Sequence, residues 1–235
     1  MSKITEEEVQ KILPTKGPSF KEVKNYLEKY NNEYIVIKCG GSVLVNQDLF
    51  NNFINDISIL NKLGFIPIII HGGGKRISNK LNEFGIKSEF INGLRVTDEK
   101  SINVVEEVLN NFNTEIIEAL KKNSCDSQGI TNKQSNILLV EQEDKKLGAR
   151  RLIIMSDVEG VLDNNKKLIP EIDTNKINEL IKNKTISGGM IPKIKNCLDV
   201  ASNGVKGVCI IDGRLDHSIL FELLSDKGSG TLIRA

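Results

Sequence analysis

The sequence contains few of the residues that mark several classes of protein. It has no tryptophan, five prolines, four cysteines and two histidines in 235 residues. The cysteines show no C-x-x-C spacing, so a zinc site is poorly supported and reduced thiols in a cytoplasmic protein are expected. With 32 Lys and Arg against 31 Asp and Glu, no net field draws the chain to nucleic acid or to an anionic membrane.

Long apolar runs are also missing. The first residues, M-S-K-I-T-E-E-E-V, are acidic and no apolar run follows them, which is unlike a signal peptide. The longest aliphatic runs have the length of a strand and are far too short to span a membrane. The length of the chain still allows a sizeable core in one large or two small lobes.

The segment around which the chain is organised reads Y-I-V-I-K-C-G-G-S, at residues 34–42. Three β-branched residues in succession predict a strand buried on both faces. Gly40 and Gly41 then allow a sharp turn whose N–H groups can approach an anion, with Lys38 beside it. The stretch is therefore either a phosphate-binding turn or an ordinary strand-to-helix turn with a solvated lysine.

A second stretch of the same kind, F-I-P-I-I-I-H-G-G-G-K, occupies residues 65–75. It predicts another buried strand, a turn at Gly72 and Gly73, and a helix after it. Two such strand ends in one sheet would place two helix N-termini, each carrying roughly +0.5 charge, around one crevice. A polyphosphate suits that crevice.

Three further motifs bring polar side chains to loops. N-G-L-R-V-T-D presents Arg95, whose planar fork matches a carboxylate but could equally pair with Asp98 or Glu99. R-L-I-I-M-S-D-V is a strand pattern that ends at Asp157, where open α/β sheets keep their ligand groups. T-I-S-G-G-M-I-P-K is a third glycine turn, and it leads to Lys193.

Strand and helix patterns alternate along the chain, which predicts an α/β fold: a three-layer sandwich with a mostly parallel central sheet. The expected helices span residues 20–30, 47–63, 99–122, 172–181, 194–202 and 217–224, and the expected strands span 35–37, 66–70, 151–158 and 207–212. A strand, turn and strand are expected within residues 129–140. The helix over 20–30 either packs on its own domain or forms an exposed arm that joins subunits.

With K-C-G-G-S, H-G-G-G-K, N-G-L-R-V-T-D, S-D-V-E-G-V and S-G-G-M-I-P-K in that order, the chain resembles the amino-acid kinase family from residue 34 to its end. The resemblance implies an amino-acid kinase-like sandwich divided into three parts. Residues 1–33 would be a helical extension, residues 34–148 a lobe that binds the amino-acid substrate, and residues 149–235 a nucleotide-binding lobe.

Within the family, the match is to members that transfer the γ-phosphoryl group of ATP to the side-chain carboxylate of N-acetyl-L-glutamate, in arginine biosynthesis. The nucleophile is already ionised, so catalysis consists of holding two anions in line and offsetting their charge. Mg²⁺ would be held mainly by the nucleotide. The resemblance assigns phosphoryl contacts to Lys38 and Lys193, nucleotide contacts to Gly40, Gly41, Asp157, Gly189 and Met190, and substrate contacts to Gly72, Gly73 and Arg95.

Some family members are inhibited by L-arginine and form hexamers through an extra N-terminal helix, whereas others are dimers. The helix that carries Tyr26 resembles that element, and the last turn of the chain resembles a wall of the inhibitor site. The matching residues are Tyr26, His217, Glu222 and Gly228. For Glu222 a solvated helix face is the alternative.

One family feature is missing between Gly148 and Ala149. A segment reading roughly N-I-N-A-D, which in the family supplies an asparagine for the substrate and an aspartate that orients both lysines, has no counterpart here. Three explanations are open: a deletion, a sequence from which a stretch has been omitted, or a divergent relative. The rival to a kinase is accordingly a non-catalytic nucleotide-binding or regulatory protein. A dinucleotide oxidoreductase is disfavoured because neither glycine turn reads G-x-G-x-x-G.

Overall fold

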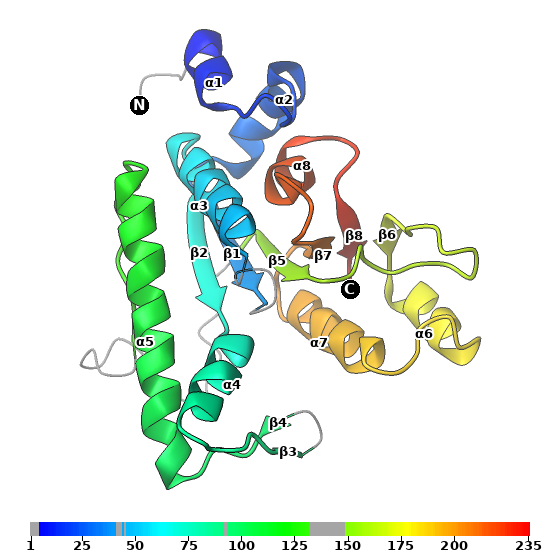
Figure 1. Ribbon diagram of the computed structural model, residues 1–235. Helices are drawn as coiled ribbons and strands as arrows, with labels where there is room; N and C mark the ends of the chain where they lie inside the picture. Colours follow the sequence, from blue (N-terminus) through cyan, green and yellow to red (C-terminus); the bar gives the residue numbers. More distant parts are fainter. Residues whose placement is uncertain (1–4, 41–43, 45, 92–93, 132–148) are drawn as a thin grey trace.

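A six-stranded sheet runs through the whole molecule (Figure 1). The computed structural model describes residues 5–40, 44, 46–91, 94–131 and 149–235. The strands lie in the order β2 (Ile66–His71), β1 (Tyr34–Cys39), β5 (Arg151–Ser156), β7 (Val208–Asp212), β8 (Gly230–Ile233) and β6 (Glu171–Ile172). Strands β2, β1, β5 and β7 are parallel, and the pair β8 and β6 runs the other way. The predicted mostly parallel sheet is confirmed.

Eight helices are present in the described ranges: α1 (Glu6–Ile12), α2 (Phe20–Tyr30), α3 (Gln47–Lys62), α4 (Gly74–Glu83), α5 (Glu99–Lys122), α6 (Thr174–Lys182), α7 (Met190–Ser202) and α8 (Ser218–Leu224). The short strands β3 (Phe90–Ile91) and β4 (Leu94–Arg95) form a separate hairpin. Polar side chains fix several helix starts. Thr5 and Ser19 form capping boxes with Glu8 and Glu22, and Asp98 caps α5.

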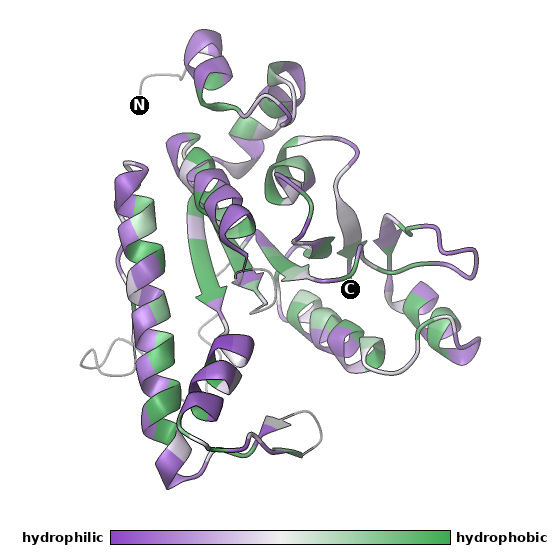
Figure 2. Ribbon diagram, in the orientation of Figure 1, coloured by the Kyte–Doolittle hydropathy of each residue, from purple (hydrophilic) through white to green (hydrophobic). Residues whose placement is uncertain are grey.

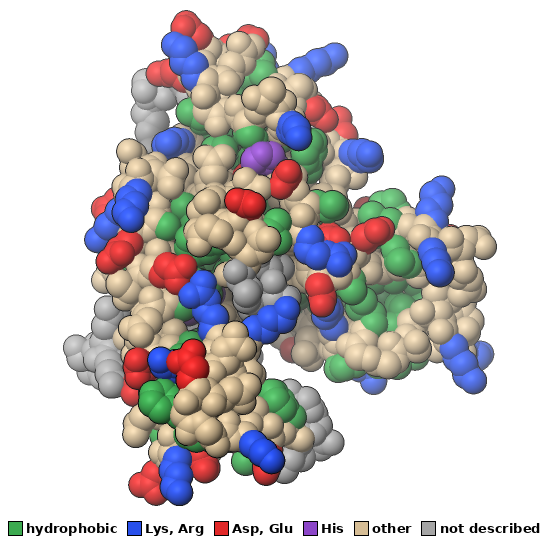
Figure 3. All heavy atoms as spheres, in the orientation of Figure 1, with side chains coloured by type: hydrophobic (Ala, Val, Ile, Leu, Met, Phe, Trp, Pro, Cys, Tyr) green, Lys and Arg blue, Asp and Glu red, His purple; other side chains and the backbone are tan. Residues whose placement is uncertain are grey.

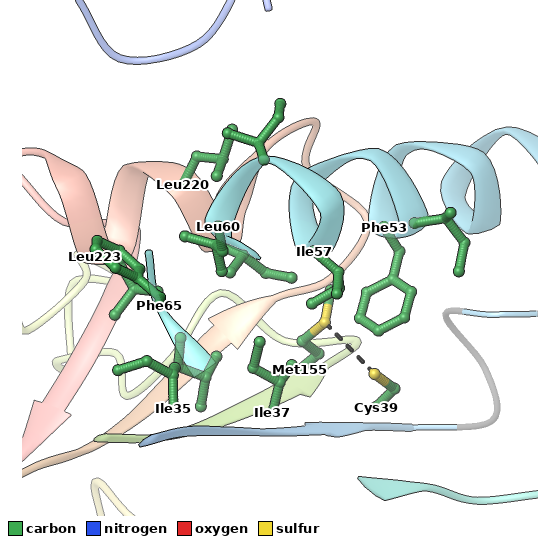
Figure 4. Close-up of a cluster of buried hydrophobic side chains, with 14 of the residues drawn as sticks. Ile35, Ile37, Cys39, Phe53, Ile57, Leu60, Phe65, Met155, Leu220 and Leu223 are labelled. Carbon is green, nitrogen blue, oxygen red and sulfur yellow. Dashed lines mark hydrogen bonds between the residues drawn. The ribbon is translucent and has the colours of Figure 1, made fainter. Parts of the chain in front are cut away.

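One face of the sheet carries the larger core. Ile35, Ile37 and Cys39 alternate along β1 and point toward α3, where they meet Phe53 and Ile57 (Figure 4). The Cys39 sulfur lies 3.9 Å from the Met155 sulfur of β5. Helices α5 and α8 complete this layer, which explains the green stripes along the helices in Figure 2.

The other face carries a smaller core over β5, β7 and β8. Val208 and Ile210 of β7 pack there with Ile177 of α6 and with Ile194 and Cys197 of α7. Figure 1 shows both helices below these strands. Helices therefore lie on both sides of the sheet, in three layers as predicted.

The N-terminal helices pack on the larger core. Val23 is fully buried and Tyr30 is 2% exposed, with its ring edge-on to Phe65 at 5.6 Å between centroids. Tyr26 stacks on Tyr30 at 6.2 Å. Of the two readings of this helix, packing on its own domain is the one that the structure supports.

Sequence reasoning was wrong about some elements near the C-terminus. Residues 171–172 form β6, so the helix begins at Thr174 rather than at residue 172, and α7 begins at Met190 rather than at residue 194. Strand β8 was not predicted, because a four-residue strand that begins with glycine is a weak signal. A Cβ at Gly230 would lie 2.0 Å from the Ile210 carbonyl oxygen, so this close strand pairing requires glycine.

Most of the strand, turn and strand expected within residues 129–140 lies outside the described residues, and residues 129–131 have no regular structure. All four cysteines are free and buried. Among the described helices, none combines the length and apolar character that a membrane span requires. The boundary expected at residues 148 and 149 falls within one continuous sheet, so the division into two lobes stays a prediction.

Candidate functional site

The carboxyl ends of β1, β5 and β7 meet at one edge of the sheet. Lys38 of β1 lies opposite Ile154 of β5, and Ser156 at the end of β5 lies opposite Asp212 at the end of β7. Because side chains alternate along a strand, Lys38, Ser156 and Asp212 project from the same face. Strand spacing puts the Cα atoms of Lys38 and Ser156 about 8 Å apart.

Lys193 approaches this edge from the first turn of α7. Its Nζ donates a hydrogen bond to Ser156 Oγ at 2.7 Å. Lys38 projects from the same face of the sheet as Ser156, so both lysines lie at this edge. Figure 3 shows several Lys and Arg side chains, with Asp and Glu among them, near the middle of this face of the molecule.

The glycine turns surround the same strand ends. Gly40 follows β1 directly, whereas Gly41 lies outside the described residues. The Gly72 N–H donates to the Cys39 carbonyl at 3.3 Å, so it extends the β1–β2 ladder and is not free for an anion here. A methyl group at Gly72 or Gly189 would meet no atom within 4 Å, whereas one at Gly73 would press on Leu109 at 2.9 Å.

At the third glycine turn, Gly189 caps α7 without a side-chain bond and Met190 is the first helical residue. The positive end of the α7 dipole therefore lies at the turn that also delivers Lys193. Asp157, one residue beyond β5, is exposed. Both features are compatible with the nucleotide contacts expected of Gly189, Met190 and Asp157, which stay predictions.

Arg95 lies next to the second glycine turn. Its guanidinium donates to the Gly74 carbonyl at 3.1 Å, to Ser78 Oγ at 2.7 Å and to Ser88 Oγ, and it stacks 4.7 Å from the Phe90 ring centroid. Asp98 instead accepts from the Ser101 backbone at 2.8 Å, as the α5 cap. The side chain is thus fixed beside α4, which suits a substrate contact better than the alternative salt bridge to Asp98.

Sequence reasoning missed a second arginine, Arg76, which ties α4 to its surroundings. Arg76 pairs with both carboxylate oxygens of Glu115 at 2.7 and 3.2 Å and lies 4.0 Å from the Phe112 ring centroid. It also donates to the Leu44 carbonyl at 3.3 Å. Arg76 therefore links Leu44 to α5. Its position directly after the motif H-G-G-G-K could have marked Arg76 as a candidate in the sequence.

An ion pair at the end of β7 was also missed. Arg214 donates to the two carboxylate oxygens of Asp212 at 2.8 and 2.7 Å, and this pairing lowers the pKa of Asp212. Asp212 is 3% exposed. The motif I-I-D-G-R at the end of a strand could have indicated this pair in the sequence. The pair lies next to Ser156, because Asp212 is opposite Ser156 in the sheet.

Three residues expected at an arginine site lie around the C-terminal part of α8. Tyr26 donates to Asp226 at 2.6 Å. Glu222 accepts from the Ser229 N–H at 2.8 Å, next to Gly228, whose φ of +66° favours glycine. Glu222 is half-buried and caps this loop, so the alternative of a solvated helix face does not describe it.

His217 lies apart from these three residues. It precedes α8 with φ +57°, and its Nδ1 lies 2.7 Å from Asp56 Oδ1 of α3. His217 directly precedes α8 and Glu222 is its fifth residue, so the two are separated by about 7.5 Å along the helix axis. The hydrogen bond to Asp56 raises the pKa of His217, and burial raises that of Asp56.

Comparison with known proteins shows the family to which the chain belongs. The amino acid kinase family matches residues 33–146 and 145–212. The acetylglutamate kinase of Pelagibacter ubique (strain HTCC1062) is 55% identical over 287 residues, covering 100% of both chains. The acetylglutamate kinase of Campylobacter fetus subsp. fetus (strain 82-40) is 36% identical over 264 residues, covering 89% of this chain and 94% of its own.

Solved structures share the fold at low identity. An N-acetylglutamate synthase from Neisseria gonorrhoeae, complexed with coenzyme A and N-acetylglutamate, matches with a TM-score of 0.75 at 19% identity, over 92% of this chain and 62% of that one. The protein smu.665 from Streptococcus mutans UA159 matches with a TM-score of 0.65 at 24% identity, over 86% of this chain and 98% of that one. These likenesses establish the architecture alone.

The comparisons also bear on the missing segment. The Pelagibacter alignment has 287 positions against 235 residues here, so at least 52 of its positions (287 − 235) have no counterpart in this chain. The two stretches that match the family meet at residues 145–146. The interruption lies where the motif N-I-N-A-D was expected.

Proposed function

Because the chain belongs to the amino acid kinase family, we propose that it transfers the γ-phosphoryl group of ATP to the side-chain carboxylate of N-acetyl-L-glutamate. The product is an acyl phosphate. The observation that carries the proposal is that Lys193 donates to Ser156 while Lys38 projects from the same face at the same carboxyl edge of the sheet. The full-length match to an acetylglutamate kinase supports the choice of substrate.

The roles of the residues follow from charge. Both reactants are anions, so the chain must bring them together and offset the charge that develops between them. Lys38 is exposed at the strand end and would contact the transferred phosphoryl group, and Lys193, held by Ser156, would contact the leaving-group side. Gly40, Gly189 and Met190 would bind the nucleotide with their backbone groups, and Asp157 would face it.

Arg95 is assigned to the substrate. Its Nη1 and Nη2 atoms already donate to Ser88, Gly74 and Ser78, so a substrate carboxylate would take the remaining N–H groups or displace a serine. Gly73 would lie against the substrate, and Gly72 would do so after its bond to Cys39 opens. The planar, charged guanidinium group of Arg95 and its fixed position favour a bidentate contact with a carboxylate.

ATP carries Mg²⁺ into such reactions, where the ion offsets phosphate charge. Among the residues that the structure describes, no three His, Cys, Asp or Glu side chains gather as ligands for a metal ion. We assign the ion mainly to the phosphates of the nucleotide. The reaction is placed in the cytoplasm, where the free cysteines would stay reduced.

A non-catalytic nucleotide-binding protein is the second candidate, and one observation favours it. Lys193 is held by a hydroxyl group, whereas the family aspartate that orients both lysines has no counterpart. Calorimetry with ATP and N-acetyl-L-glutamate, combined with trapping of the acyl phosphate by hydroxylamine, separates the candidates. Trapped product supports the kinase, and binding without product supports the rival. An intact mass near 26.1 kDa would establish that the chain is as short as its sequence.

Inhibition by L-arginine and assembly into dimers or hexamers are further parts of the proposal. Tyr26, Glu222 and Gly228 gather at one end of α8, and His217 lies at the other. Removing residues 1–30 would strip Val23 and Tyr30 from the core and is therefore a poor test. Glu222→Gln is a better one: inhibition should weaken in this variant, and unchanged inhibition would count against the site.

A further inference from the structure

The second glycine turn is packed against a single helix, α5. His71, which precedes the turn, meets the Phe112 ring edge-on at 5.0 Å between centroids. Arg76, which follows the turn, lies 4.0 Å from the centroid of the same ring. Within the turn, a Cβ at Gly73 would come 2.9 Å from Leu109. Helix α5 therefore contacts the chain before, within and after the turn.

Arg76 joins α4 to α5 through its whole guanidinium group. It donates to both carboxylate oxygens of Glu115, at 2.7 and 3.2 Å, and to the Leu44 carbonyl at 3.3 Å. Phe112 and Glu115 are three residues apart on one face of α5, so Arg76 stacks on the first while it pairs with the second. The paired side chains are 35% and 39% exposed, so their attraction adds little stability. Two parallel bonds and a stacked ring nevertheless fix the direction of the group.

Helix α4 in turn holds Arg95. The Arg95 guanidinium donates to the Gly74 carbonyl at 3.1 Å and to Ser78 Oγ at 2.7 Å, and both acceptors lie near the start of α4. Ser78 Oγ also donates to the Gly74 carbonyl at 3.0 Å. Arg76 lies between these two residues in the helix. A shift of α4 would therefore move both acceptors, and Arg95 with them.

We propose that Arg76 is a positioning residue for the substrate site: by fixing α4 on α5, it sets where Arg95 stands. The inference rests on the proposed function, in which Arg95 binds a carboxylate of the substrate. Nucleotide contacts should be unaffected, because Gly189 and Met190 lie at the start of α7, which packs on the smaller core. A purely stabilising role for Arg76 predicts equal losses for both ligands instead.

The test compares Arg76→Lys with the parent chain by calorimetry, with N-acetyl-L-glutamate and ATP titrated separately. Lysine keeps the charge but has neither the planar fork nor the stacking surface. We expect the dissociation constant for N-acetyl-L-glutamate to rise about tenfold, and that for ATP to change by less than about twofold. Equal rises for the two ligands, or no rise for N-acetyl-L-glutamate, would overturn the inference.

Lys80→Gln is the matched control. Lys80 also belongs to α4 and, with Arg76, lines a cavity of about 330 Å³ between α4 and α5. It pairs within its own helix, however, with Glu83 at 3.0 Å. This variant should leave both dissociation constants within about twofold of the parent values. A loss equal to that of Arg76→Lys would show that removing any cation from α4 has the same effect, and would overturn the inference.

Reversing the charges of the pair provides a rescue. Arg76→Glu should weaken binding of N-acetyl-L-glutamate at least as much as Arg76→Lys, because two carboxylates would then face each other. Glu115→Arg in the same chain should restore part of the affinity, since the pair forms again with its ends exchanged. No recovery in the double variant would show that the link to Glu115 is not what positions α4.

A readout that needs no substrate separates this inference from the proposed function. In the ligand-free protein, side-chain NMR follows the rotation of the Arg95 guanidinium, which its bonds to α4 and to Ser88 restrain. Arg76→Lys should speed this rotation and Lys80→Gln should not. Unchanged rotation in Arg76→Lys would overturn the inference. If the parent chain bound no N-acetyl-L-glutamate, the proposed substrate would be wrong, and the rotation would still decide whether Arg76 positions Arg95.

Discussion

At the carboxyl edge of the sheet Lys38 is exposed and Lys193 donates to a single hydroxyl, whereas around α8 the polar candidates already have carboxylate or backbone partners. Tyr26 bonds to Asp226, His217 to Asp56 and Glu222 to Ser229. A ligand at the first region would find charge available, while a ligand at the second must displace existing bonds. The difference separates a region suited to chemistry from one that holds α2, α3 and α8 together.

The largest effect is expected at the carboxyl edge. Lys38→Ala should lower the turnover number by about 10² to 10³, or roughly 2.7 to 4 kcal/mol of transition-state stabilisation. The reason is that the variant lacks the positive charge that contacts the transferred phosphoryl group. The melting temperature of the variant should hardly change. Hydroxamate formation measures the rate, with Lys195→Ala, an exposed lysine of α7, as the control. An unaltered turnover number would contradict the role.

The next effect concerns stability around α8. Asp56→Ala should lower the free energy of unfolding by about 1 to 3 kcal/mol, because it leaves the half-buried His217 ring without its partner. Urea denaturation measures the loss. The control, Glu118→Ala at an exposed position of α5, should stay within about 0.5 kcal/mol. If the two variants lost equal stability, the Asp56–His217 bond would not hold α3 and α8 together.

A smaller effect should appear as pH dependence. The pKa of His217 is raised from 6.5, first by its hydrogen bond to Asp56 and also by the charge of Asp216. As the pH rises, His217 therefore loses its proton at a higher pH in the folded state than in the unfolded state. The resulting stability is complete below pH 6.5 and is lost as pH rises through the folded-state pKa. Burial also raises the pKa of Asp56 above its ordinary value of 3.8, so Asp56 too makes the folded state less stable as the pH rises above that value.

The comparison is made with His217→Asn, since asparagine tolerates a φ of +57°. The stability advantage of the parent chain over this variant should shrink between pH 5.5 and 8.5. The change should be smaller than in Asp56→Ala, because neutral His217 can still donate to Asp56. An advantage that grows with pH would show that the pair does not hold the proton on His217.

The smallest effect is expected from Tyr26→Phe. Its bond to Asp226 lies near the surface, so the loss should fall near the low end of about 0.5 to 1.5 kcal/mol. Because this bond raises the pKa of Tyr26 to about 12, the loss should not vary between pH 6 and 9. Tyr34→Phe, which alters an exposed tyrosine at the start of β1, is the matched control in urea denaturation.

Much of the fold could be predicted from periodicity alone. The runs I-V-I and I-P-I-I-I gave β1 and β2, and apolar residues three and four apart gave α3 and α5. Strands β6 and β8 were missed because they are short and their pairing is decided by neighbours in space. Candidate site residues were proposed mainly from motifs that contain glycine or lysine, and their roles stay predictions. Arg76 was missed because its partner Glu115 is set by packing. The Asp212–Arg214 pair was missed although both residues stand in the motif I-I-D-G-R.

Taken alone, the sequence determined the alternation of strands and helices, the glycine turns, and the residues that carry charge at strand ends. These features follow from local backbone preference and side-chain chemistry. Only the tertiary structure decided that Lys193 reaches Ser156 and that His217 is bonded to Asp56. Such contacts join residues distant in the chain, and strand register and the packing of helices on the sheet set them.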